Sequence, residues 1–425
     1  MSTRREILAL ASGAALTAAA LPAPAHAGGR DDGWIATWAA APTTIPPGTP
    51  QELTGQTVRQ VVHTSVGGNR LRIRLTNEFG TTPLHVGEVH VAIRAGDGAS
   101  TDARPGTDRR VTFGGQRSAT VPAGAPLVSD PVALTVPPGA DLVISLYLPD
   151  RTPVTTVAAF AFQENVIATG NVTAATRVTP TSTIPQYVFL AGVSVHGGGG
   201  SGAVVTLGDS ITNGANTVTN ANHRWPDLLA ARFRKARIGL GVANVGISGN
   251  RLLHDPNPPA GDPAEAFAAW FGESALRRFD RDVVAQPGAT HLVVLLGVND
   301  LGHPGTVAPP GEVVTAADLI GGHRQLIARA RVAGLRTHGA TILPFKDDTL
   351  GFYTPENERK RSALNRWIRT SGEYDEVIDF DAVVRDTTDP QRLAAAYDSG
   401  DHLHPNDAGM AAMAAAVKLG GFQHR

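Results

Sequence analysis

The sequence predicts an α/β protein in two parts, an antiparallel β-sandwich followed by a parallel sheet that is covered by helices. Residues 34–195 consist of short segments in which apolar and polar side chains alternate, a pattern typical of strands with one face in water. Beyond a glycine-rich stretch, short apolar strands alternate with helical patterns, which is typical of a parallel sheet. With 425 residues, the chain is also too long for one ordinary domain.

The first 27 residues have the pattern of an export signal. Arg4 and Arg5 precede an alanine-rich apolar stretch, and Ala25 and Ala27 are the small residues that a signal peptidase requires before its cut. Polar residues and prolines interrupt this stretch, so a stable membrane span of ~20 apolar residues is not expected. We therefore predict that residues 1–27 are removed and that the protein is secreted, by the twin-arginine route that exports folded proteins.

Residues 28–196 are predicted to form the β-sandwich domain. In residues 71–75 apolar and charged side chains alternate at every position, as a strand with one wet face requires. Clusters of turn residues, such as Gly67-Gly68-Asn69, separate such segments. Strands are expected over residues 57–64, 71–75, 86–93, 141–148 and 155–162.

Residues 197–202 are predicted to be a glycine-rich linker, and residues 203–425 to form the α/β domain. Helices are expected around Trp225, around Leu326 and around Leu364, where apolar residues recur at helical spacing. Strands are expected over residues 203–207, 291–296, 337–343 and 377–380. Because ligands of parallel sheets bind beyond the carboxyl ends of the strands, the residues there are the candidates for function.

Four sequence blocks lie at these strand ends or before the last helix. Residues 208–210 (Gly-Asp-Ser) present a serine where the chain turns from strand to helix. Residues 246–250 (Gly-Ile-Ser-Gly-Asn) contain glycines that allow a tight turn and expose backbone amides. Residues 297–300 (Gly-Val-Asn-Asp) follow another buried strand, and residues 401–404 (Asp-His-Leu-His) precede the final helix.

Together, the four blocks resemble the SGNH, or GDSL-type, family of serine esterases and acylhydrolases. This resemblance implies a three-layer α/β/α sandwich of the flavodoxin type over residues 203–425. It places the residues that name the family at Ser210, Gly249, Asn299 and His404. The β-rich half resembles that of members with a leading β-domain, which are grouped with arylesterases of plant-polysaccharide gene clusters.

The chemistry of ester hydrolysis explains why these residue types are needed. Ser210 would be the nucleophile, and His404 would take its proton and return it to the leaving alcohol, a role worth about 10²–10⁴ in rate. By the resemblance, Asp401 completes the triad and holds the histidine tautomer. The backbone N–H groups of Ser210 and Gly249 and the side-chain amide of Asn299 would stabilise the oxyanion.

Other polar residues near the blocks have structural interpretations. Asp209 is expected to cap the serine turn, and Asp300 to lock its loop by hydrogen bonds. His402 and His404 form a His-x-His pair, but without cysteine or a further cluster no metal is expected, and His402 is assigned to a turn or rim. No cofactor is expected. His254 and His303 either line the pocket or lie on surface loops, and the surface is favoured.

Large aromatic and basic residues also have structural interpretations. Trp34 and Trp38 form either a sugar-stacking platform or a buried anchor between the two domains, and burial is favoured. Trp225 is expected in the core. The run of Arg277, Arg278 and Arg281 is interpreted as a solvated helix face.

The sequence therefore predicts a secreted serine esterase that removes acetyl or other short acyl groups from carbohydrate, aryl or alkyl esters. Alternatives are a carbohydrate-binding surface protein with an inactive hydrolase half, or a lipase-type acylhydrolase. The absence of a G-x-S-x-G motif argues against the α/β-hydrolase fold. The expected partner is an ester substrate such as an acetylated polysaccharide. The net charge of -1 argues against nucleic acid, and the lack of cysteine excludes thiolate nucleophiles.

Overall fold

The structure is a computed structural model that describes residues 33–48 and 51–423. The predicted export signal lies outside these residues and stays a prediction, as do the predicted domain boundaries. Among the described residues, no helix combines the length and the apolar character needed to cross a bilayer.

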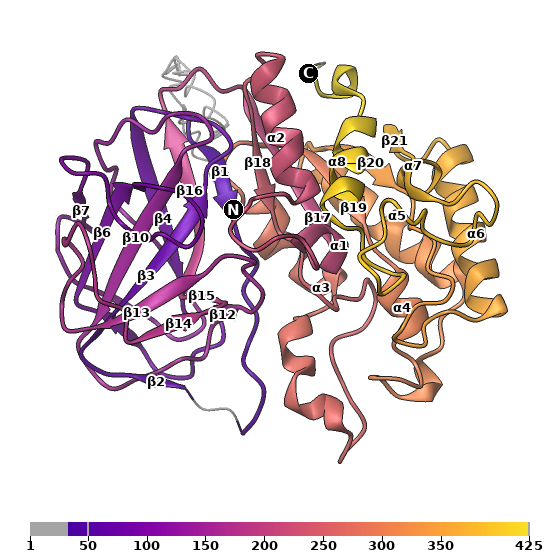
Figure 1. Ribbon diagram of the computed structural model, residues 1–425, viewed down its shortest axis with the longest axis horizontal. Coiled ribbons are helices and arrows are strands. Elements are labelled where there is room, and N and C mark those ends of the chain that lie inside the picture. Colours follow the sequence, from indigo (N-terminus) through magenta and orange to yellow (C-terminus); the bar gives the residue numbers. More distant parts are fainter. Residues whose placement is uncertain (1–32, 49–50, 424–425) are drawn as a thin grey trace, which may run out of the picture. The chain divides into compact units, whose positions relative to one another are not determined.

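Two antiparallel sheets form the β-rich region, which confirms the predicted sandwich (Figure 1). Their strand orders are β1-β16-β4-β9 and β14-β13-β3-β10-β6-β7. The strands of the first sheet are β1 (Ile35–Ala39), β16 (Leu190–His196), β4 (Arg70–Thr76) and β9 (Pro126–Val128). The strands of the second are β14 (Ser182–Ile184), β13 (Asn165–Thr169), β3 (Gln56–His63), β10 (Asp141–Leu148), β6 (Glu88–Ile93) and β7 (Arg109–Val111). Smaller two-stranded pairs are made by β2 (Glu52–Leu53) with β11 (Thr152–Pro153), β5 (Leu84–Val86) with β8 (Ala119–Val121), and β12 (Val157–Ala158) with β15 (Tyr187–Val188).

The predicted alternation along β4 corresponds to real burial. Leu71, Ile73 and Leu75 are fully buried between the sheets, whereas the arginines between them are partly exposed. Strand β10 has the predicted bounds and pairs antiparallel with β3 along its whole length. The alternation of apolar and polar residues therefore predicts the position of these strands correctly.

The prediction of one strand over residues 155–162 is wrong. Only Val157–Ala158 is a strand, and the chain then turns, with Phe162 at a φ of 47° in the left-handed region. The carbonyls of Phe160 and Phe162 accept hydrogen bonds from Asn213 and Asn220, which lie beyond the serine, and not from a neighbouring strand. These distant partners interrupt the strand.

A parallel sheet with the order β18-β17-β19-β20-β21 forms the centre of the α/β region. In chain order this is 2-1-3-4-5, the flavodoxin-like arrangement, so the predicted fold class is confirmed. The strands are β17 (Gly202–Gly208), β18 (Leu240–Asn244), β19 (Ala289–Leu295), β20 (Arg336–Ala340) and β21 (Glu376–Ile378).

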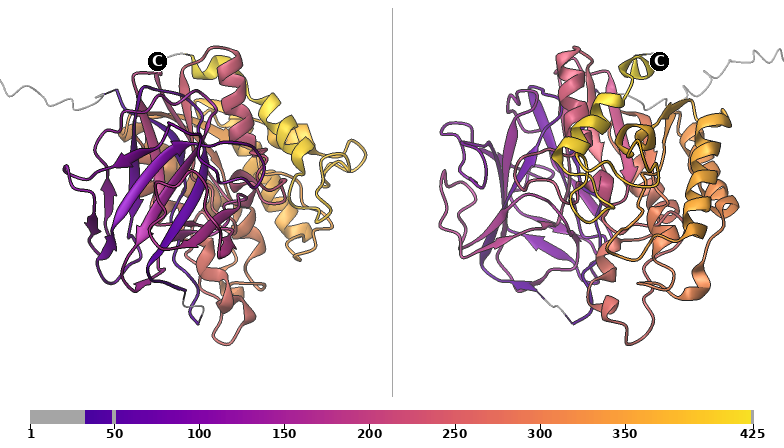
Figure 2. Two further views of the ribbon diagram at one scale, coloured as in Figure 1. Left: turned by 60° about the vertical axis from the view of Figure 1, so that its left-hand side comes forward. Right: turned by 45° about the vertical axis from the view of Figure 1, so that its right-hand side comes forward.

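Helices cover both faces of this sheet (Figure 2). On one face, Val204 and Val293 pack with α2 (Trp225–Lys235) and α8 (Asp407–Ala416). Trp225 is completely buried there, as predicted. On the other face, the alternate strand residues pack with α3 (Ala275–Phe279), α5 (Ala316–Val332) and α6 (Pro355–Thr370). The remaining helical turns are α1 (Ser210–Asn213), α4 (Val298–Gly302), α7 (Phe380–Val384), η1 (Pro263–Ala266), η2 (Ala268–Phe271), η3 (Asp280–Val284), η4 (Pro310–Glu312) and η5 (Leu419–Phe422).

The β-rich region packs directly on the edge of the parallel sheet. The backbone N–H of Ala36 in β1 donates to the carbonyl of Pro287 at 2.8 Å, and that of Val242 in β18 donates to Ser65 Oγ at 2.9 Å. Gly241 has no room for a side chain, because a Cβ there would lie 2.1 Å from the carbonyl oxygen of Ala36. One cluster of buried apolar residues continues through both regions.

Candidate active site

The serine lies where β17 ends and the short helix α1 begins. Asp209 caps this helix, and its carboxylate accepts a hydrogen bond from the backbone N–H of Ile211 at 3.0 Å, which confirms the predicted cap. Glycine is required at position 208, directly before Asp209, because a Cβ on Gly208 would lie 2.1 Å from Thr212 Oγ1. This close packing fixes the direction in which the backbone presents Ser210.

Ser210, His404 and Asp401 form a continuous hydrogen-bonded chain. His404 Nε2 lies 2.7 Å from Ser210 Oγ, and His404 Nδ1 lies 2.6 Å from Asp401 Oδ2. An ionised carboxylate can only accept, so Nδ1 carries the hydrogen and Nε2 is left free to accept from the serine hydroxyl. The structure thus brings together three predicted residues from opposite ends of the α/β region.

The surroundings of Asp401 keep it ionised. Its partial burial acts to raise the pKa of the carboxyl group, but hydrogen bonds from the His404 ring and from the backbone of Leu403 and His404 outweigh burial and hold the pKa well below its usual range. Asn216 Nδ2 donates to Asp401 Oδ2 at 2.9 Å. The sequence analysis missed Asn216, and its only signal was an asparagine close to the serine turn.

The candidate oxyanion donors follow neighbouring strands. Ser210 follows β17, Gly249 lies in the loop after β18, and Asn299 lies in the turn after β19. The strand order reverses between β17 and β19, and ligands of such sheets bind at this point. Asn299 Nδ2 donates one hydrogen to the carbonyl of Asn250 at 3.0 Å, which places this amide beside the Gly249 loop.

Gly249 is a position where glycine is required. Its φ of 79° is in the left-handed region, and a Cβ would lie 2.1 Å from Cδ1 of Phe271. The ring of Phe271 therefore packs directly on the backbone of the loop. The roles of Ser210, Gly249 and Asn299 as oxyanion donors stay predictions.

Asp300 holds the part of the Gly249 loop that follows Asn250. Its carboxylate accepts from the backbone N–H groups of Leu252 at 2.7 Å and Leu253 at 2.9 Å, so the predicted hydrogen-bonded lock is confirmed. Burial raises the pKa of Asp300 to about 6, although these amides act against the shift. Burial likewise raises the pKa of Asp209 to about 7.

The surface interpretation of His303 is wrong. This side chain is buried, and its ring lies between Phe271 and Phe352, at centroid distances of 5.3 Å and 5.5 Å. Burial lowers the pKa of His303 to about 3, so the ring is neutral. His254 is half-buried, and His402 is exposed and hydrogen-bonded to Asp398.

The interpretation of the arginine run as a solvated face is wrong for Arg278. Arg278 is fully buried and donates to the carbonyls of Val245 at 2.8 Å and Gly208 at 3.3 Å, and to Asn250 Oδ1 at 2.9 Å. It therefore ties the ends of β17 and β18 together directly below the serine. Arg277 is exposed as expected, and Arg281 is only partly so.

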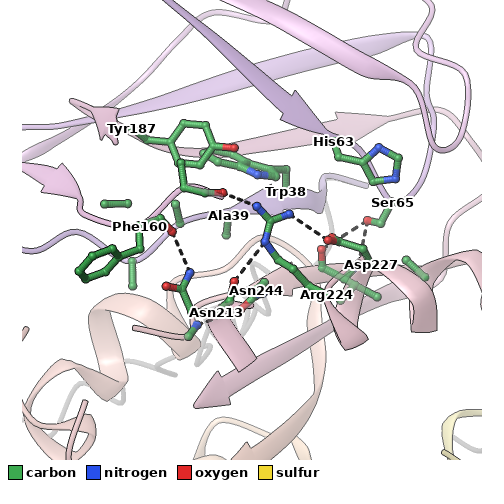
Figure 3. A pocket seen from close by; sticks show the side chains of 17 residues that line it. Trp38, Ala39, His63, Ser65, Phe160, Tyr187, Asn213, Arg224, Asp227 and Asn244 are labelled. Carbon is green, nitrogen blue, oxygen red and sulfur yellow. Dashed lines mark hydrogen bonds and ion pairs between the residues drawn. The ribbon is translucent and has the colours of Figure 1, made fainter. Parts of the chain in front are cut away.

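A small cavity of about 40 Å³ lies between the β-rich region and the part of the α/β region formed by α2, β18 and Asn213 (Figure 3). Trp38 lies along it with its ring 4.8 Å from that of Tyr187, and Arg224 donates to the carbonyl of Asn213 at 3.1 Å. Trp34, which does not line this cavity, is buried, with its ring 5.4 Å from that of His196 and the guanidinium of Arg72 over it. For Trp34, the predicted burial is confirmed.

A hydroxyl, an imidazole and a carboxylate in one hydrogen-bonded chain, at the reversal point of a parallel sheet, are the groups of a hydrolase with a serine nucleophile. A model of the GDSL-like lipase/acylhydrolase family matches residues 206–412. Residues 206–412 therefore resemble a GDSL-like lipase/acylhydrolase domain, which makes the protein an enzyme of the esterase or acylhydrolase class.

Several solved structures resemble this chain. They include a GDSL-like lipase from Bacteroides thetaiotaomicron, with 19% identity over 52% of this chain and 89% of that one and a TM-score of 0.38. An acetylxylan esterase from Geobacillus stearothermophilus has 17% identity over 53% of this chain and 96% of that one, with a TM-score of 0.39. A carbohydrate acetylesterase from Sinorhizobium meliloti has 15% identity over 50% and 95%, with a TM-score of 0.38. The comparison with curated proteins gives no match.

Proposed function

We propose that the protein is a secreted serine esterase that removes acetyl or other short acyl groups from carbohydrate esters or small aryl and alkyl esters. The observation that carries this proposal is the chain of hydrogen bonds from Ser210 Oγ to His404 at 2.7 Å and from His404 to Asp401 at 2.6 Å. This chain supplies an activated nucleophile and a base whose orientation is fixed by a third group.

The reaction would proceed through an acyl-enzyme. Ser210 Oγ attacks the ester carbonyl while its proton moves to His404 Nε2, and the proton then passes to the departing alcohol as the ester C–O bond breaks. Water next attacks the acyl-serine, gives one proton to His404 and releases the acid, and His404 returns that proton to Ser210. Asp401 stays ionised throughout and balances the charge of the imidazolium.

The oxyanion of each tetrahedral intermediate would be held by the backbone N–H groups of Ser210 and Gly249 and by the side-chain amide of Asn299. Asn299 Nδ2 has a second hydrogen besides the one it donates to Asn250, and this hydrogen would face the substrate. Removal of one such donor typically costs roughly 2.7–4 kcal/mol of transition-state stabilisation.

Two observations support a short acyl group. The ring of Phe271 packs against the backbone of Gly249, which leaves little room for a long acyl chain on that side of the proposed oxyanion site. The aromatic content of 5% also provides little material for the apolar lid of a long-chain lipase. The carbohydrate part of the proposal rests on the resemblance of the β-rich region to that of polysaccharide-linked esterases.

The proposal is tested by hydrolysis of 4-nitrophenyl acetate. We expect kcat to fall by roughly 10⁶-fold in Ser210→Ala, because no other group replaces the nucleophile. Ser201→Ala, at an exposed position before β17, is the matched control and should keep wild-type activity. Equal activity of Ser210→Ala and wild type would disprove the assignment. Affinity for polysaccharide without ester turnover, and without labelling of Ser210 by an organophosphonate, would favour the binding-protein alternative.

Acyl length and alcohol are tested with a substrate panel. Activity on acetylated xylan, and on 4-nitrophenyl esters of increasing acyl length, should be highest for acetyl and fall with each added carbon. Rising activity toward long chains would support the lipase alternative.

We also propose that the protein is exported by the twin-arginine route. The support is Arg4-Arg5 before the alanine-rich stretch, and the Ala25-His26-Ala27 sequence before the expected cut. Mass spectrometry of the protein from culture medium should give a chain that begins at Gly28. In Arg4→Lys/Arg5→Lys cells the uncut chain should be retained, and unchanged export of this variant would contradict the route.

A further inference from the structure

The asparagine segment, residues 213–224, begins with the last residue of the serine helix α1 and ends just before α2. Four asparagines lie in it, and three of them, Asn216, Asn220 and Asn222, have φ values of 62°, 69° and 55° in the left-handed region. Asparagine tolerates this conformation better than most residues do. The sharp turns fold the segment so that it contacts both the β-rich region and the candidate active site.

On one side, the asparagine segment binds three successive carbonyls of the β-rich region. The carbonyl of Phe160 accepts from Asn213 Nδ2 at 3.2 Å, and that of Phe162 accepts from the backbone N–H of Asn220 at 3.0 Å. The carbonyl of Ala161, between them, accepts from the guanidinium of Arg224 (Figure 3). These are the residues that the sequence wrongly predicts to continue a strand.

The side chain of Asn220 completes this contact. Its Oδ1 accepts from Gln163 Nε2 at 2.7 Å and from the backbone N–H of Glu164 at 2.8 Å, and its Nδ2 donates to Glu164 at 2.6 Å. Phe162 is held beside it with a φ of 47°, a left-handed conformation that is strained for a bulky residue. Such strain persists only where surrounding contacts over-determine the backbone, as these hydrogen bonds do.

On the other side, the same segment contacts two groups of the candidate active site. Asn213 Oδ1 accepts from Ser248 Oγ at 2.9 Å, and Ser248 directly precedes Gly249. Asn216 Nδ2 donates at 2.9 Å to Asp401 Oδ2, the same oxygen that binds the ring of His404, and at 2.9 Å to Ser399 Oγ. A single side chain, that of Asn213, thus touches both the β-rich region and the Gly249 loop.

We propose that the β-rich region positions the catalytic groups through the asparagine segment, with Asn213 and Asn216 as positioning residues. Asn213 sets the Gly249 loop, and Asn216 sets the carboxylate of Asp401. This inference rests on the proposed function, because it takes the roles of Gly249 and Asp401 from there. It assigns to residues 160–164 a part in catalysis that does not require them to touch the substrate.

The physical reason is the narrow tolerance of acyl-transfer chemistry. Catalytic groups have to lie within about 0.5 Å of the productive geometry, and a shift of about 1 Å can cost roughly 100-fold in rate. Asn216 is exposed, so its orientation depends on the turns that the contacts with residues 160–164 impose on the segment. Loosening those contacts would therefore reach Asp401 and Gly249 without any change to the catalytic residues.

The test compares four single variants of the full chain on 4-nitrophenyl acetate, a substrate too small to bind along the β-rich region. Gln163→Ala and Asn220→Ala weaken the contact between the regions, and Asn213→Ala and Asn216→Ala remove the contacts with the active site. In each variant kcat should fall by about 10–100-fold, with KM changed by less than about threefold, because positioning acts on the transition state. Asn171→Ala is the control, since Asn171 Nδ2 donates to Glu88 within the β-rich region, and it should keep the wild-type kcat.

The pH profile of Asn216→Ala separates positioning from a general structural effect. Loss of the amide donor leaves more negative charge on Asp401 Oδ2, which strengthens its attraction for the His404 imidazolium. The acid limb of kcat/KM should therefore move to higher pH in this variant and stay in place in Asn171→Ala. A merely structural role would lower the amount of active enzyme without moving this limb.

Melting curves are measured for every variant so that unfolding is not mistaken for mispositioning. Wild-type kcat in both Gln163→Ala and Asn213→Ala would overturn the inference. It would also be overturned if the loss of kcat only followed the loss of melting temperature across all variants, with Asn171→Ala on the same trend. If Ser210→Ala is inactive while all four variants are fully active, only this inference fails. If Ser210→Ala is active, the proposed function fails first.

Discussion

At the scale of single residues, Arg278 connects the strand ends that carry the candidate active site. Its guanidinium lies in the interior and donates to two strand-end carbonyls, to Asn250 and to Asp282 at 3.1 Å. Burial acts to lower the pKa of Arg278, and the carboxylate of Asp282 opposes that shift. A buried, fully hydrogen-bonded charge of this kind fixes the backbone before Ser210 and the loop before Gly249.

Arg278→Met should therefore destabilise the protein strongly. The change removes one buried donor from Asp282 and from the carbonyls of Gly208 and Val245. Asp282 keeps its ion pair with Arg281 at 2.8 Å, so the loss should lie toward the lower end of the roughly 3–5 kcal/mol that breaking a buried pair costs. Urea unfolding followed by circular dichroism measures the loss. The neighbouring Arg277→Met is the matched control. Arg277 is 64% exposed, so this variant should stay within about 0.5 kcal/mol of wild type. Equal stability of the two variants would contradict the structural role of Arg278.

The same residues show how far sequence reasoning reaches at this scale. Ser210, Asp401 and His404 were predictable because each lies in a short local block whose chemistry is distinctive. Arg277 and Arg278 are adjacent and chemically identical, and only the fold determines which of them points into the interior. Asn213 and Asn216 were not predicted either, since the partners that give them meaning lie some distance away in the sequence.

At the scale of elements, hydrophobic periodicity is sufficient to predict a helix or strand whose backbone makes the regular hydrogen bonds of that element. Strand β10 was predicted with its observed bounds, and the buried residues Leu319, Leu326, Ile327 and Ala330 of α5 lie on one face as expected. The segment 155–162 was also predicted to be a strand, yet its later carbonyls bond to the asparagine segment. Alternation indicates which side chains are buried and contains no information about what the backbone binds.

Strands β19 and β20 carry a pair of buried histidines that meet the short helix η5. The ring of His338 stacks on Phe422 at a centroid distance of 4.1 Å, and His291 lies 5.5 Å from His338. Burial lowers the pKa of His291 to about 4, and burial together with the charges of His291 and Arg336 lowers the pKa of His338 to about 3. Both rings are therefore neutral in the folded protein at ordinary pH.

These histidines should make the fold sensitive to acid. The pKa of a histidine in an unfolded chain is about 6.5, so as the pH falls below that value the unfolded chain takes up protons that the folded chain does not. The stabilisation is present above pH 6.5 and is lost progressively as the pH approaches the folded pKa of about 3. The raised pKa values of Asp209 and Asp300 have the opposite effect on the pH dependence of stability. The role of a histidine is therefore measured by the difference in this pH dependence between wild type and a variant without that histidine.

His338→Phe should keep the stack on Phe422 and lose the titration. Its free energy of unfolding should fall less steeply than that of wild type between pH 6.5 and 4, by up to about 1.4 kcal/mol per pH unit. Urea unfolding at a series of pH values measures these slopes. Val332→Ala, at an exposed position without a titratable group, is the control and should leave the slope unchanged. Parallel curves for His338→Phe and wild type would show that His338 does not titrate with unfolding.

At the scale of the whole molecule, the β-rich and α/β regions are built as one structure. Residues Gly33–Arg425 form a single compact unit, and the same cluster of buried residues includes Ile35 and Leu71 from one region and Val205 and Leu292 from the other. The glycine-rich stretch between the regions is itself packed, since a Cβ on Gly200 would lie 2.5 Å from Cδ1 of Ile35. Because the two regions share one core, we expect them to unfold together.

The chain should therefore unfold in one cooperative transition, and a cavity made in the β-rich region should destabilise the catalytic region equally. Leu71→Ala removes a fully buried side chain of strand β4 and should cost roughly 2–5 kcal/mol. Leu229→Ala makes the matching cavity in α2, beside the parallel sheet. In both variants, loss of esterase activity on heating and loss of the far-ultraviolet circular dichroism signal should occur at the same, lowered temperature. If Leu71→Ala instead produces two transitions, with esterase activity lost only in the unshifted one, the regions are independent and their shared core does not couple them.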